Sequence, residues 1–124
     1  MDEKKKRILV VEDEIIIRTS LVMYLDNFNY QVYENETGET ALEFLDTNRV
    51  DLIIADMRLP GISGEMLINS AYKIDNSIKF IIYTGSLDYT LPKSLKEIGM
   101  TDLNIIHKPV YDMNEFIKVI RRLI

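Results

Sequence analysis

Residues 52–56 read Leu-Ile-Ile-Ala-Asp, a continuous apolar run that ends in an acidic residue. Similar runs occur at residues 8–11 and 80–83, and weaker ones at residues 30–33 and 103–106. Continuous runs of this length, rich in β-branched residues, are typical of parallel strands that are covered on both faces. The sequence therefore predicts five strands, with the run that begins at residue 52 near the centre of the sheet.

Amphipathic stretches separate these runs. Apolar residues recur every three or four positions within residues 14–27, 38–45 and 64–74 and after Asp112, as on one face of a helix. In the first stretch, the expected buried face consists of Ile17, Leu21 and Leu25. Side chains suited to N-caps precede the later stretches, at Thr37, Ser63 and Asp112.

The stretch from residue 87 to residue 100 is interrupted by Pro92 and Gly99, so it predicts a short or irregular fourth helix. Strand and helix then alternate five times along the chain. This alternation is typical of an α/β domain with a doubly wound parallel sheet. Ligands of such sheets bind beyond the carboxyl ends of the strands. Functional residues are therefore expected directly after the strands.

The composition fits one globular domain. The chain has 124 residues, of which 47% are hydrophobic and 28% charged, and its formal net charge is −5. This charge argues against nucleic-acid binding, which needs a clustered basic face. The chain has no cysteine and one histidine, so disulfides, thiolate sites and multi-histidine metal sites are excluded.

Residues 4–7 form the one basic run, Lys-Lys-Lys-Arg. We interpret residues 1–6 as a solvated basic lead-in and residues 7–124 as the folded domain. No apolar run approaches the roughly 20 residues of a membrane-spanning helix, and no secretory signal is visible. The sequence therefore predicts a cytoplasmic protein that does not contact a membrane.

Chemically active residues follow four of the five predicted strands. Glu12 and Asp13 follow the first strand, Asp56 the third, Thr84 the fourth and Lys108 the fifth. Because the carboxyl ends of parallel strands meet at one edge of the sheet, we expect these carboxylates, the hydroxyl and the ammonium group to lie together.

This set of groups has a coherent chemistry. Neighbouring carboxylates repel one another unless a cation intervenes, and Mg²⁺ prefers oxygen ligands and leaves room for a substrate phosphate. A lysine and a hydroxyl can contact phosphoryl oxygens. A carboxylate can also be the nucleophile that forms an aspartyl phosphate, and Asp56, after the central strand, is best placed for that role.

Each of these residues has an ordinary structural interpretation when taken alone. Glu12 and Asp13 could be solvated or cap the next helix, and Asp56 could be a turn residue. Thr84 could end a strand, and Lys108 could be a solvated surface residue. The joint pattern favours the functional interpretation, because a single fold brings all of them together.

The ordered set resembles the receiver domain of two-component response regulators. The matching segments are Val-Val-Glu-Asp-Glu at residues 10–14, Asp-Met-Arg-Leu-Pro-Gly at residues 56–61, Tyr-Thr-Gly at residues 83–85 and Lys-Pro at residues 108–109. The resemblance covers essentially residues 7–124. It implies a flavodoxin-like, five-stranded parallel sheet with strand order 2-1-3-4-5.

The resemblance implies the roles of the phosphoryl-binding residues. Asp56 would accept a phosphoryl group, Lys108 would pair with the phosphoryl oxygens, and Thr84 would bond to the group and report its arrival. The bond between Lys108 and Pro109 would be cis, a form that is open to proline at low cost.

The resemblance also implies a Mg²⁺ site. Asp13 and Asp56 would ligate the ion directly, together with the backbone carbonyl of Arg58. Glu12 would act through a metal-bound water. Mg²⁺ is thus the one cofactor that the resemblance predicts.

The implied function is a phosphorylation-dependent signalling switch rather than an enzyme, although the domain would promote its own phosphorylation and dephosphorylation. Its implied partners are a sensor histidine kinase or phosphotransfer protein and a downstream output domain or protein. The sequence leaves open a phosphorylation-dependent homodimer. The alternative interpretation is a degenerate receiver that acts as a phosphorylation-independent interaction module.

The chain departs from the family pattern at two positions. The family usually has an aromatic residue three positions before its lysine, and here that position is Ile105, which puts the usual coupling to the threonine in doubt. Gly85 stands where alanine is common. Arg58 occupies a position that varies in the family, and we hypothesise that its guanidinium pairs with Glu12 or a phosphoryl oxygen and alters the phosphoryl lifetime.

Two other classes of protein fit less well. A phosphatase of the haloacid dehalogenase type needs a second aspartate two residues after its nucleophile, where this chain has Arg58. A flavodoxin-like cofactor binder needs a phosphate-binding loop after the first strand, where this chain has acidic residues. The single histidine, His107, is interpreted as a packing or surface residue.

Overall fold

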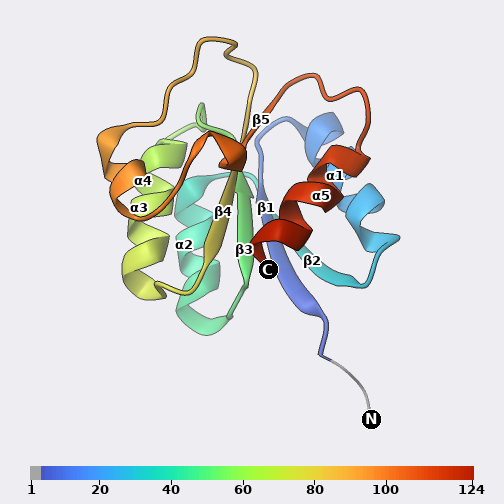
Figure 1. Cartoon of the computed structure of the whole chain (residues 1–124). Helices are drawn as coiled ribbons and strands as arrows, with labels where there is room; N and C mark the ends of the chain where they lie inside the picture. The colour runs from blue at the N-terminus through green and yellow to red at the C-terminus, as the bar shows by residue number, and fades with distance from the viewer. Residues whose placement is uncertain (1–3) are drawn as a thin grey trace.

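The computed structural model describes residues 4–124 and contains a parallel sheet with the strand order β2-β1-β3-β4-β5 (Figure 1). The strands are β1 (Lys6–Val11), β2 (Tyr30–Asn35), β3 (Leu52–Ala55), β4 (Lys79–Thr84) and β5 (Ile105–His107). Every neighbouring pair of strands is parallel. The predicted fold class and strand order are confirmed.

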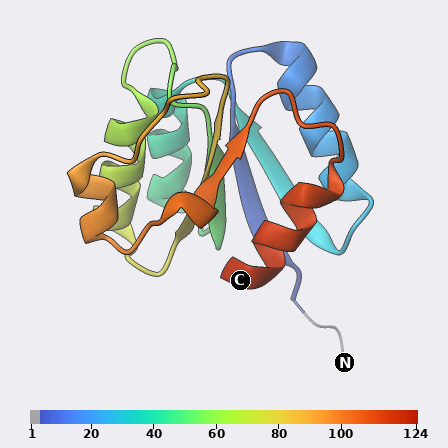
Figure 2. The same cartoon turned by 45° about the horizontal axis from the view of Figure 1, so that its top comes forward.

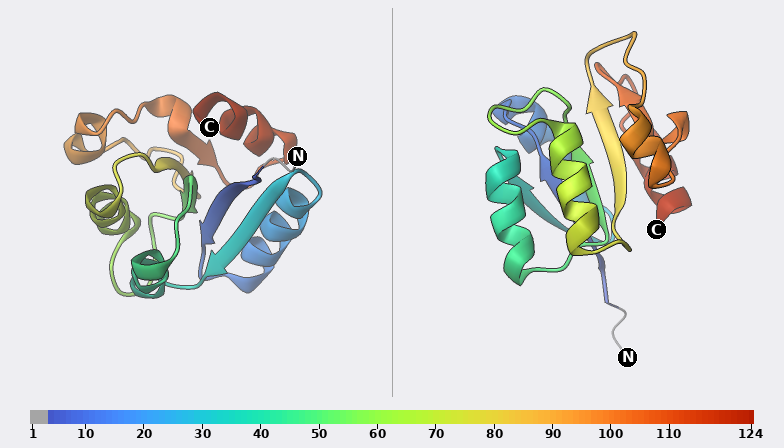
Figure 3. Two further views of the ribbon diagram at one scale, coloured as in Figure 1. Left: turned by 90° about the horizontal axis from the view of Figure 1, so that it is seen from below. Right: turned by 90° about the vertical axis from the view of Figure 1, so that its left-hand side faces the viewer.

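Helices cover both faces of the sheet. One face carries α2 (Gly38–Thr47), α3 (Gly64–Ile74) and α4 (Lys93–Glu97), and the other carries α1 (Ile15–Asp26) and α5 (Asn114–Leu123), as Figures 1 and 3 show. Two clusters of buried apolar side chains match these layers. Each strand contributes alternate residues to the two clusters.

The central strand β3 shows why its sequence is continuously apolar. Successive side chains of a strand point to opposite faces, so a strand covered on both faces needs an apolar residue at every position. Ile53 packs into the cluster beneath α2 and α3, and Ile54 packs into the cluster beneath α1 and α5. Both side chains are at most 1% exposed, and each contributes about 1.5–3 kcal/mol through burial.

Most of the predicted helix boundaries are confirmed. Thr37 and Ser63 are the N-caps of α2 and α3, and their hydroxyl oxygens accept hydrogen bonds from the backbone amides of Thr40 and Met66. The cap predicted at Asp112 is wrong by one residue, because Met113 holds the N-cap position of α5. The Asp112 carboxylate nevertheless accepts the amide of Asn114 at 2.9 Å. The short fourth helix is confirmed.

The predicted buried face of α1 is partly wrong. Leu21 and Leu25 are buried, but Ile17 is only partly buried, and Arg18 is 7% exposed. The positions 18, 21 and 25 also share one helix face, since they are spaced i, i+3 and i+7. Ile17 still packs against the core with Leu21 and Leu25, and the charged Arg18 is buried beside these apolar residues.

The predicted fifth strand is displaced by two residues at its start. Leu103 and Asn104 belong to a 3₁₀ turn, η1 (Asp102–Asn104), and β5 begins at Ile105. The turn forms because the Thr101 hydroxyl accepts the amide of Leu103 while the Asn104 side chain accepts the amide of Thr101. The Asn104 amide group also donates to the carbonyl of Phe80 at 2.8 Å, which ties the turn to β4.

The loops after the strands gather at one edge of the sheet, and the N-terminal segment enters at the opposite edge (Figures 1 and 2). The strand β1 begins at Lys6, so the last residue of the predicted lead-in belongs to the sheet. Residues 1–3 of that lead-in lie outside the described residues. Within residues 4–124, no helix combines the length and the apolar character that a membrane crossing requires.

Gly64 at the start of α3 packs directly against the loop that follows β3. A Cβ at this position would overlap the carbonyl oxygen of Asp56 and come within 2.9 Å of the Met57 Cα. These are backbone atoms, so the loop itself must shift. We expect Gly64→Ala to lower the free energy of unfolding in urea by about 1–3 kcal/mol.

Gly85→Ala is the matched control for Gly64→Ala. A Cβ at position 85 would meet only the Cδ of Lys108, at 4.0 Å. We expect this variant to unfold within about 0.5 kcal/mol of the wild type. Equal losses in the two variants would show that close packing at Gly64 is unimportant.

Candidate functional site

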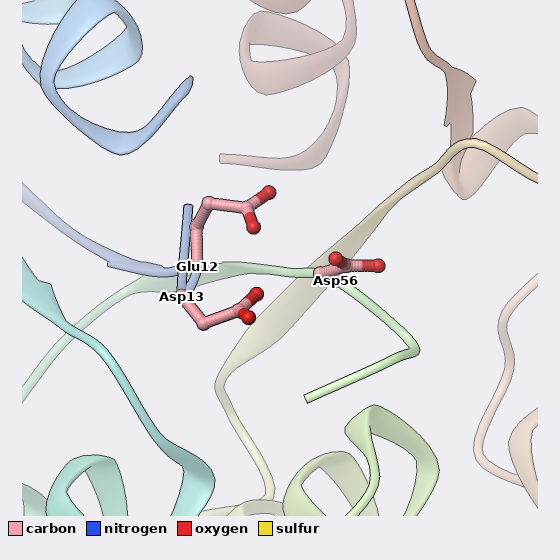
Figure 4. A group of neighbouring side chains, drawn as sticks. All are labelled: Glu12, Asp13 and Asp56. Carbon is pink, nitrogen blue, oxygen red and sulfur yellow. The ribbon is translucent and has the colours of Figure 1, made fainter. Parts of the chain in front are cut away.

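Three carboxylates meet at the carboxyl edge of the sheet. Glu12 and Asp13 follow β1, and Asp56 follows β3, the neighbouring strand (Figure 4). One carboxylate oxygen from each residue lies within 4.8 Å of the others. Glu12 and Asp56 are buried and Asp13 is exposed, so the cluster is open to solvent on the side of Asp13.

The donor set fits a hard divalent cation. It consists of carboxylate oxygens, the ligands that Mg²⁺ prefers, and its exposed side leaves room for water or a phosphate. The three carboxylates that the sequence predicted to converge do lie together.

Lys108, directly after β5, reaches across to this cluster. Its Nζ donates to the Oε1 of Glu12 at 2.7 Å and to the Oδ2 of Asp56 at 3.2 Å. The side chain of Lys108 is 15% exposed, and its Nζ also lies 5.2 Å from the centre of the Tyr83 ring. The Tyr83 ring packs edge-on against Phe116 of α5, so the aromatic surface under the ammonium group is fixed.

The pKa values of Glu12 and Lys108 are both raised, but for different reasons. Burial raises the pKa of the Glu12 carboxyl, against the opposing hydrogen bonds from Lys108 and the Glu14 amide. Burial alone would lower the pKa of Lys108, but its hydrogen bond to Glu12 and the charges of Asp56 and Glu12 outweigh burial and raise it. Both shifts favour the protonated form.

The loop after β3 is held by hydrogen bonds along its length. The backbone amide of Arg58 donates to the Oδ1 of Asp56 at 3.2 Å, which orients the carboxylate. The amide of Gly64 donates to the carbonyl of Met57, also at 3.2 Å. From α2, the Glu39 carboxylate accepts the amide of Ile62 at 3.1 Å. The position of Asp56 is therefore fixed by both α2 and α3.

Thr84 lies at the end of β4, buried at 2% exposure. Its hydroxyl oxygen accepts the amide of Ser86 at 3.2 Å, and its carbonyl accepts the amide of Lys108 at 2.8 Å. Among the described residues, its hydroxyl makes no hydrogen bond to the three carboxylates. The bond between Lys108 and Pro109 is cis, as the resemblance implied.

The predicted pairing of Arg58 with Glu12 is wrong. Lys108 holds the Oε1 of Glu12, and the amide of Glu14 donates to its Oε2. Arg58 is exposed, and within residues 4–124 its guanidinium forms no ion pair. His107 is exposed on β5, as its interpretation as a surface residue requires.

Three residues that support the site were not identified from the sequence. Arg18 donates to the carbonyl of Glu12 at 2.8 Å, Tyr83 lies beside Lys108, and the Tyr89 hydroxyl donates to the Sδ of Met57 at 3.2 Å. The only available signal for Arg18 was its spacing of i, i+3 and i+7 with two buried leucines. For Tyr89, which lies in an irregular loop, the sequence carried no signal.

The family model of the response regulator receiver domain matches residues 8–121. The chain belongs to this family. Its matched region contains all five strands' carboxyl ends and hence the whole cluster of acidic residues. Receiver domains are signalling switches of two-component systems, and the pocket of Glu12, Asp13 and Asp56 fits a phosphoacceptor site.

Individual relatives agree with this assignment. The chain is 29% identical over 117 residues to sporulation initiation phosphotransferase F of Bacillus subtilis, covering 94% of this chain and 92% of that protein. It is 38% identical over 79 residues to the regulatory protein VanR of Enterococcus faecium, covering 64% of this chain but only 34% of VanR. The chain thus spans about a third of some relatives.

A solved structure of a complex has the same fold. The response regulator protein TrrA from Thermotoga maritima, in complex with Mg²⁺–BeF, superimposes with a TM-score of 0.81 at 30% identity. The similarity covers 96% of this receiver domain and 99% of the TrrA chain.

Glu12→Gln tests the charge balance of the receiver site. Because the pKa of Glu12 is raised on folding, the stability that its protonated form contributes is complete below the ordinary value of 4.5 and is lost as pH rises through the folded value. We therefore expect the free energy of unfolding of Glu12→Gln, relative to wild type, to increase from about pH 4 to about pH 7. Urea denaturation with a chelator present measures it.

Glu36→Gln is the control for this pH series, because its carboxylate is 70% exposed and lies outside the cluster. The free energy of unfolding of Glu36→Gln, relative to wild type, should show no comparable rise with pH. If the free energy of unfolding of Glu12→Gln, relative to wild type, stays constant or falls with pH, the pKa of Glu12 is not raised by folding.

Proposed function

We propose that this receiver domain is a switch that accepts a phosphoryl group on Asp56 in the presence of Mg²⁺. The observation that carries the proposal is the position of the Asp56 carboxylate. It lies beside two further carboxylates and accepts a hydrogen bond from the ammonium group of Lys108, directly after the central strand β3. The proposed donor is the phosphohistidine of a sensor kinase or phosphotransfer protein, or a small acyl phosphate.

The proposed metal ligands are two carboxylates, one backbone carbonyl and a water held by a third carboxylate. Asp13 and Asp56 supply carboxylate oxygens, the backbone carbonyl of Arg58 is the proposed third ligand, and Glu12 is proposed to act through a water. Bound Mg²⁺ would offset the negative charge of the phosphoryl group and of the carboxylates. The TrrA complex with Mg²⁺–BeF supports this assignment by analogy.

The chain's own residues suit the transfer step. A carboxylate oxygen of Asp56 would attack phosphorus as the bond between phosphorus and the donor atom breaks. Lys108 already donates to the Oδ2 of Asp56 at 3.2 Å, so it can pair with phosphoryl oxygens placed on that carboxylate. The buried hydroxyl of Thr84 is the proposed reporter of phosphorylation, since its oxygen accepts the Ser86 amide while its O–H would donate to a phosphoryl oxygen.

Further parts of the proposal concern the setting of the domain. We propose a sensor kinase or phosphotransfer protein as upstream partner, an output domain or protein as downstream partner, and no reaction beyond self-phosphorylation and dephosphorylation. A homodimer that forms on phosphorylation stays a prediction, as does a cytoplasmic location. The division into a lead-in and a domain beginning at residue 7 also stays a prediction.

Phosphorylation by a small phosphodonor tests the central claim. With an acyl phosphate and Mg²⁺, we expect the wild-type chain to gain the mass of one phosphoryl group, and Asp56→Asn to gain none. Intact mass spectrometry measures both. Asp102→Asn, an exposed aspartate in the η1 turn, is the matched control and should be labelled like the wild type.

Two results would separate the competing interpretations. Labelling that persists in Asp56→Asn would move the phosphoacceptor to another residue. A wild-type chain that is folded but gains no mass with Mg²⁺ would favour the degenerate receiver that acts only as an interaction module.

The exposed Arg58 provides a test of phosphoryl lifetime. Arg58 lies two residues after the phosphoacceptor, and its backbone amide donates to the Asp56 carboxylate. Its guanidinium is exposed and can therefore pair with a phosphoryl oxygen on Asp56. An exposed pair of this kind is worth about 0.2–1 kcal/mol, which corresponds to a change of up to about fivefold in rate. We expect Arg58→Ala to lose its phosphoryl group roughly two to five times faster than wild type.

Arg49→Ala is the control for this experiment, because Arg49 lies in the loop before β3, at the opposite edge of the sheet. Its rate of dephosphorylation should equal that of wild type. Equal rates for Arg58→Ala and wild type would remove the hypothesis that Arg58 tunes the lifetime.

A further inference from the structure

We propose that Arg18 is a positioning residue that sets the orientation of Asp13 toward the divalent cation. Arg18 belongs to α1 and touches none of the three carboxylates of the metal site. It would act through the peptide bond that joins Glu12 to Asp13. The inference rests on the proposed function, because it assigns a residue to the proposed Mg²⁺ site.

The guanidinium of Arg18 is buried and anchored on several sides. The side chain is 8% exposed. Its Nη1 donates to the carbonyl oxygen of Glu12 at 2.8 Å, and its Nε donates to the Oε1 of Glu34 at 2.8 Å. Its Nη2 lies 3.5 Å from the Oε1 of Glu36. The planar guanidinium thus joins the end of β1 to the end of β2 and the residue that follows it.

Both backbone polar groups of Glu12, the residue before Asp13, are therefore held by hydrogen bonds. The Glu12 amide donates to the carbonyl of Asn35 at 3.1 Å, and the Glu12 carbonyl accepts from Arg18. This carbonyl belongs to the peptide plane that leads into Asp13. Fixing that plane restricts the directions in which the Asp13 side chain can leave the backbone.

Asp13 needs such backbone support more than the other two carboxylates. Glu12 is held by Lys108 and the Glu14 amide, and Asp56 by Lys108 and the Arg58 amide. Asp13 is exposed, and within residues 4–124 its carboxylate makes no hydrogen bond or ion pair. Its direction is thus set by the backbone alone, and Arg18 holds that backbone.

The positive charge of Arg18 and its positioning role predict opposite changes in Mg²⁺ affinity when Arg18 is substituted. A buried positive charge near a cation site repels the cation, so removing it would tighten Mg²⁺ binding if charge were its only influence. Loss of positioning would weaken binding, because the supports that orient metal ligands typically contribute about tenfold or more in affinity. The sign of the change in affinity therefore distinguishes the two roles.

The experiment compares Arg18→Lys, Arg18→Ala and the control Glu36→Gln by calorimetric titration with Mg²⁺. Lysine keeps the charge but cannot hold Glu12 and Glu34 with one rigid plane. We expect the dissociation constant for Mg²⁺ to rise roughly tenfold in Arg18→Ala and by several-fold in Arg18→Lys. Glu36→Gln, which removes only the longest of the three contacts, should change it less than twofold.

A second readout separates local positioning from a general loss of stability. Amide hydrogen exchange without metal should accelerate at Glu12 in Arg18→Lys while the amide of Ile54, in the middle of the buried strand β3, keeps its wild-type rate. Arg18→Lys keeps the test valid if Arg18→Ala does not fold.

The outcomes are distinct. A folded wild type that does not bind Mg²⁺ would overturn the proposed function itself. Wild-type binding together with unchanged or tighter binding in both Arg18 variants would overturn the positioning role and leave the proposed function standing. Equal acceleration of amide exchange at Glu12 and Ile54 would show that Arg18 only stabilises the fold, and the positioning role would be overturned.

Discussion

The repulsion among three carboxylates at the end of buried parallel strands is the constraint on which this receiver domain depends. Like charges within a few ångströms interact strongly where water is partly excluded. One ammonium group, that of Lys108, bonds to Glu12 and Asp56 and leaves the exposed Asp13 unbalanced. The raised pKa of Glu12 follows from its burial in these surroundings. The site therefore lowers the stability of the fold, and its acidic cluster is suited to a divalent cation.

The surrounding fold holds these charges in place without neutralising them. The parallel order brings the ends of β1 and β3 together, and the apolar strands beneath supply rigidity. A second buried cation, Arg18, bonds to the backbone of the site, while glutamates of β2 and the following turn balance its charge. Gly64 and Glu39 fix the loop after β3 through backbone contacts. Support from Arg18, Gly64 and Glu39 thus reaches the site through main-chain atoms rather than through the oxygens of the three carboxylates.

The sequence predicted those features that follow from the periodicity of apolar residues and from the residues that directly follow the strands. The bounds of β3 and α3 and the convergence of Glu12, Asp13 and Asp56 follow from these rules alone. The start of β5 did not, because the side chains of Thr101 and Asn104 form a turn within an apolar run. The burial of Arg18 and the freedom of Arg58 also escaped prediction, since ion-pair partners depend on which segments the fold brings together.

The absence of an aromatic residue at Ile105 changes where a response to phosphorylation can arise. Ile105 and Tyr89 both pack against the core cluster under α3 and α4. The short helix α4 is tied to α3, because the Ser94 hydroxyl donates to Glu65 at 2.9 Å and accepts from Asn69 at 3.1 Å. Among residues 4–124, the loop between Thr84 and α4 forms no hydrogen bond to α3. Its hydrogen bonds instead connect it to the site. Tyr89 bonds to the residue after Asp56, and Thr84 holds the start of the loop through Ser86. A chemical change at Asp56 shifts a conformation only through contacts that differ between states, and the hydrogen bonds of Thr84 and Tyr89 connect that loop to the site.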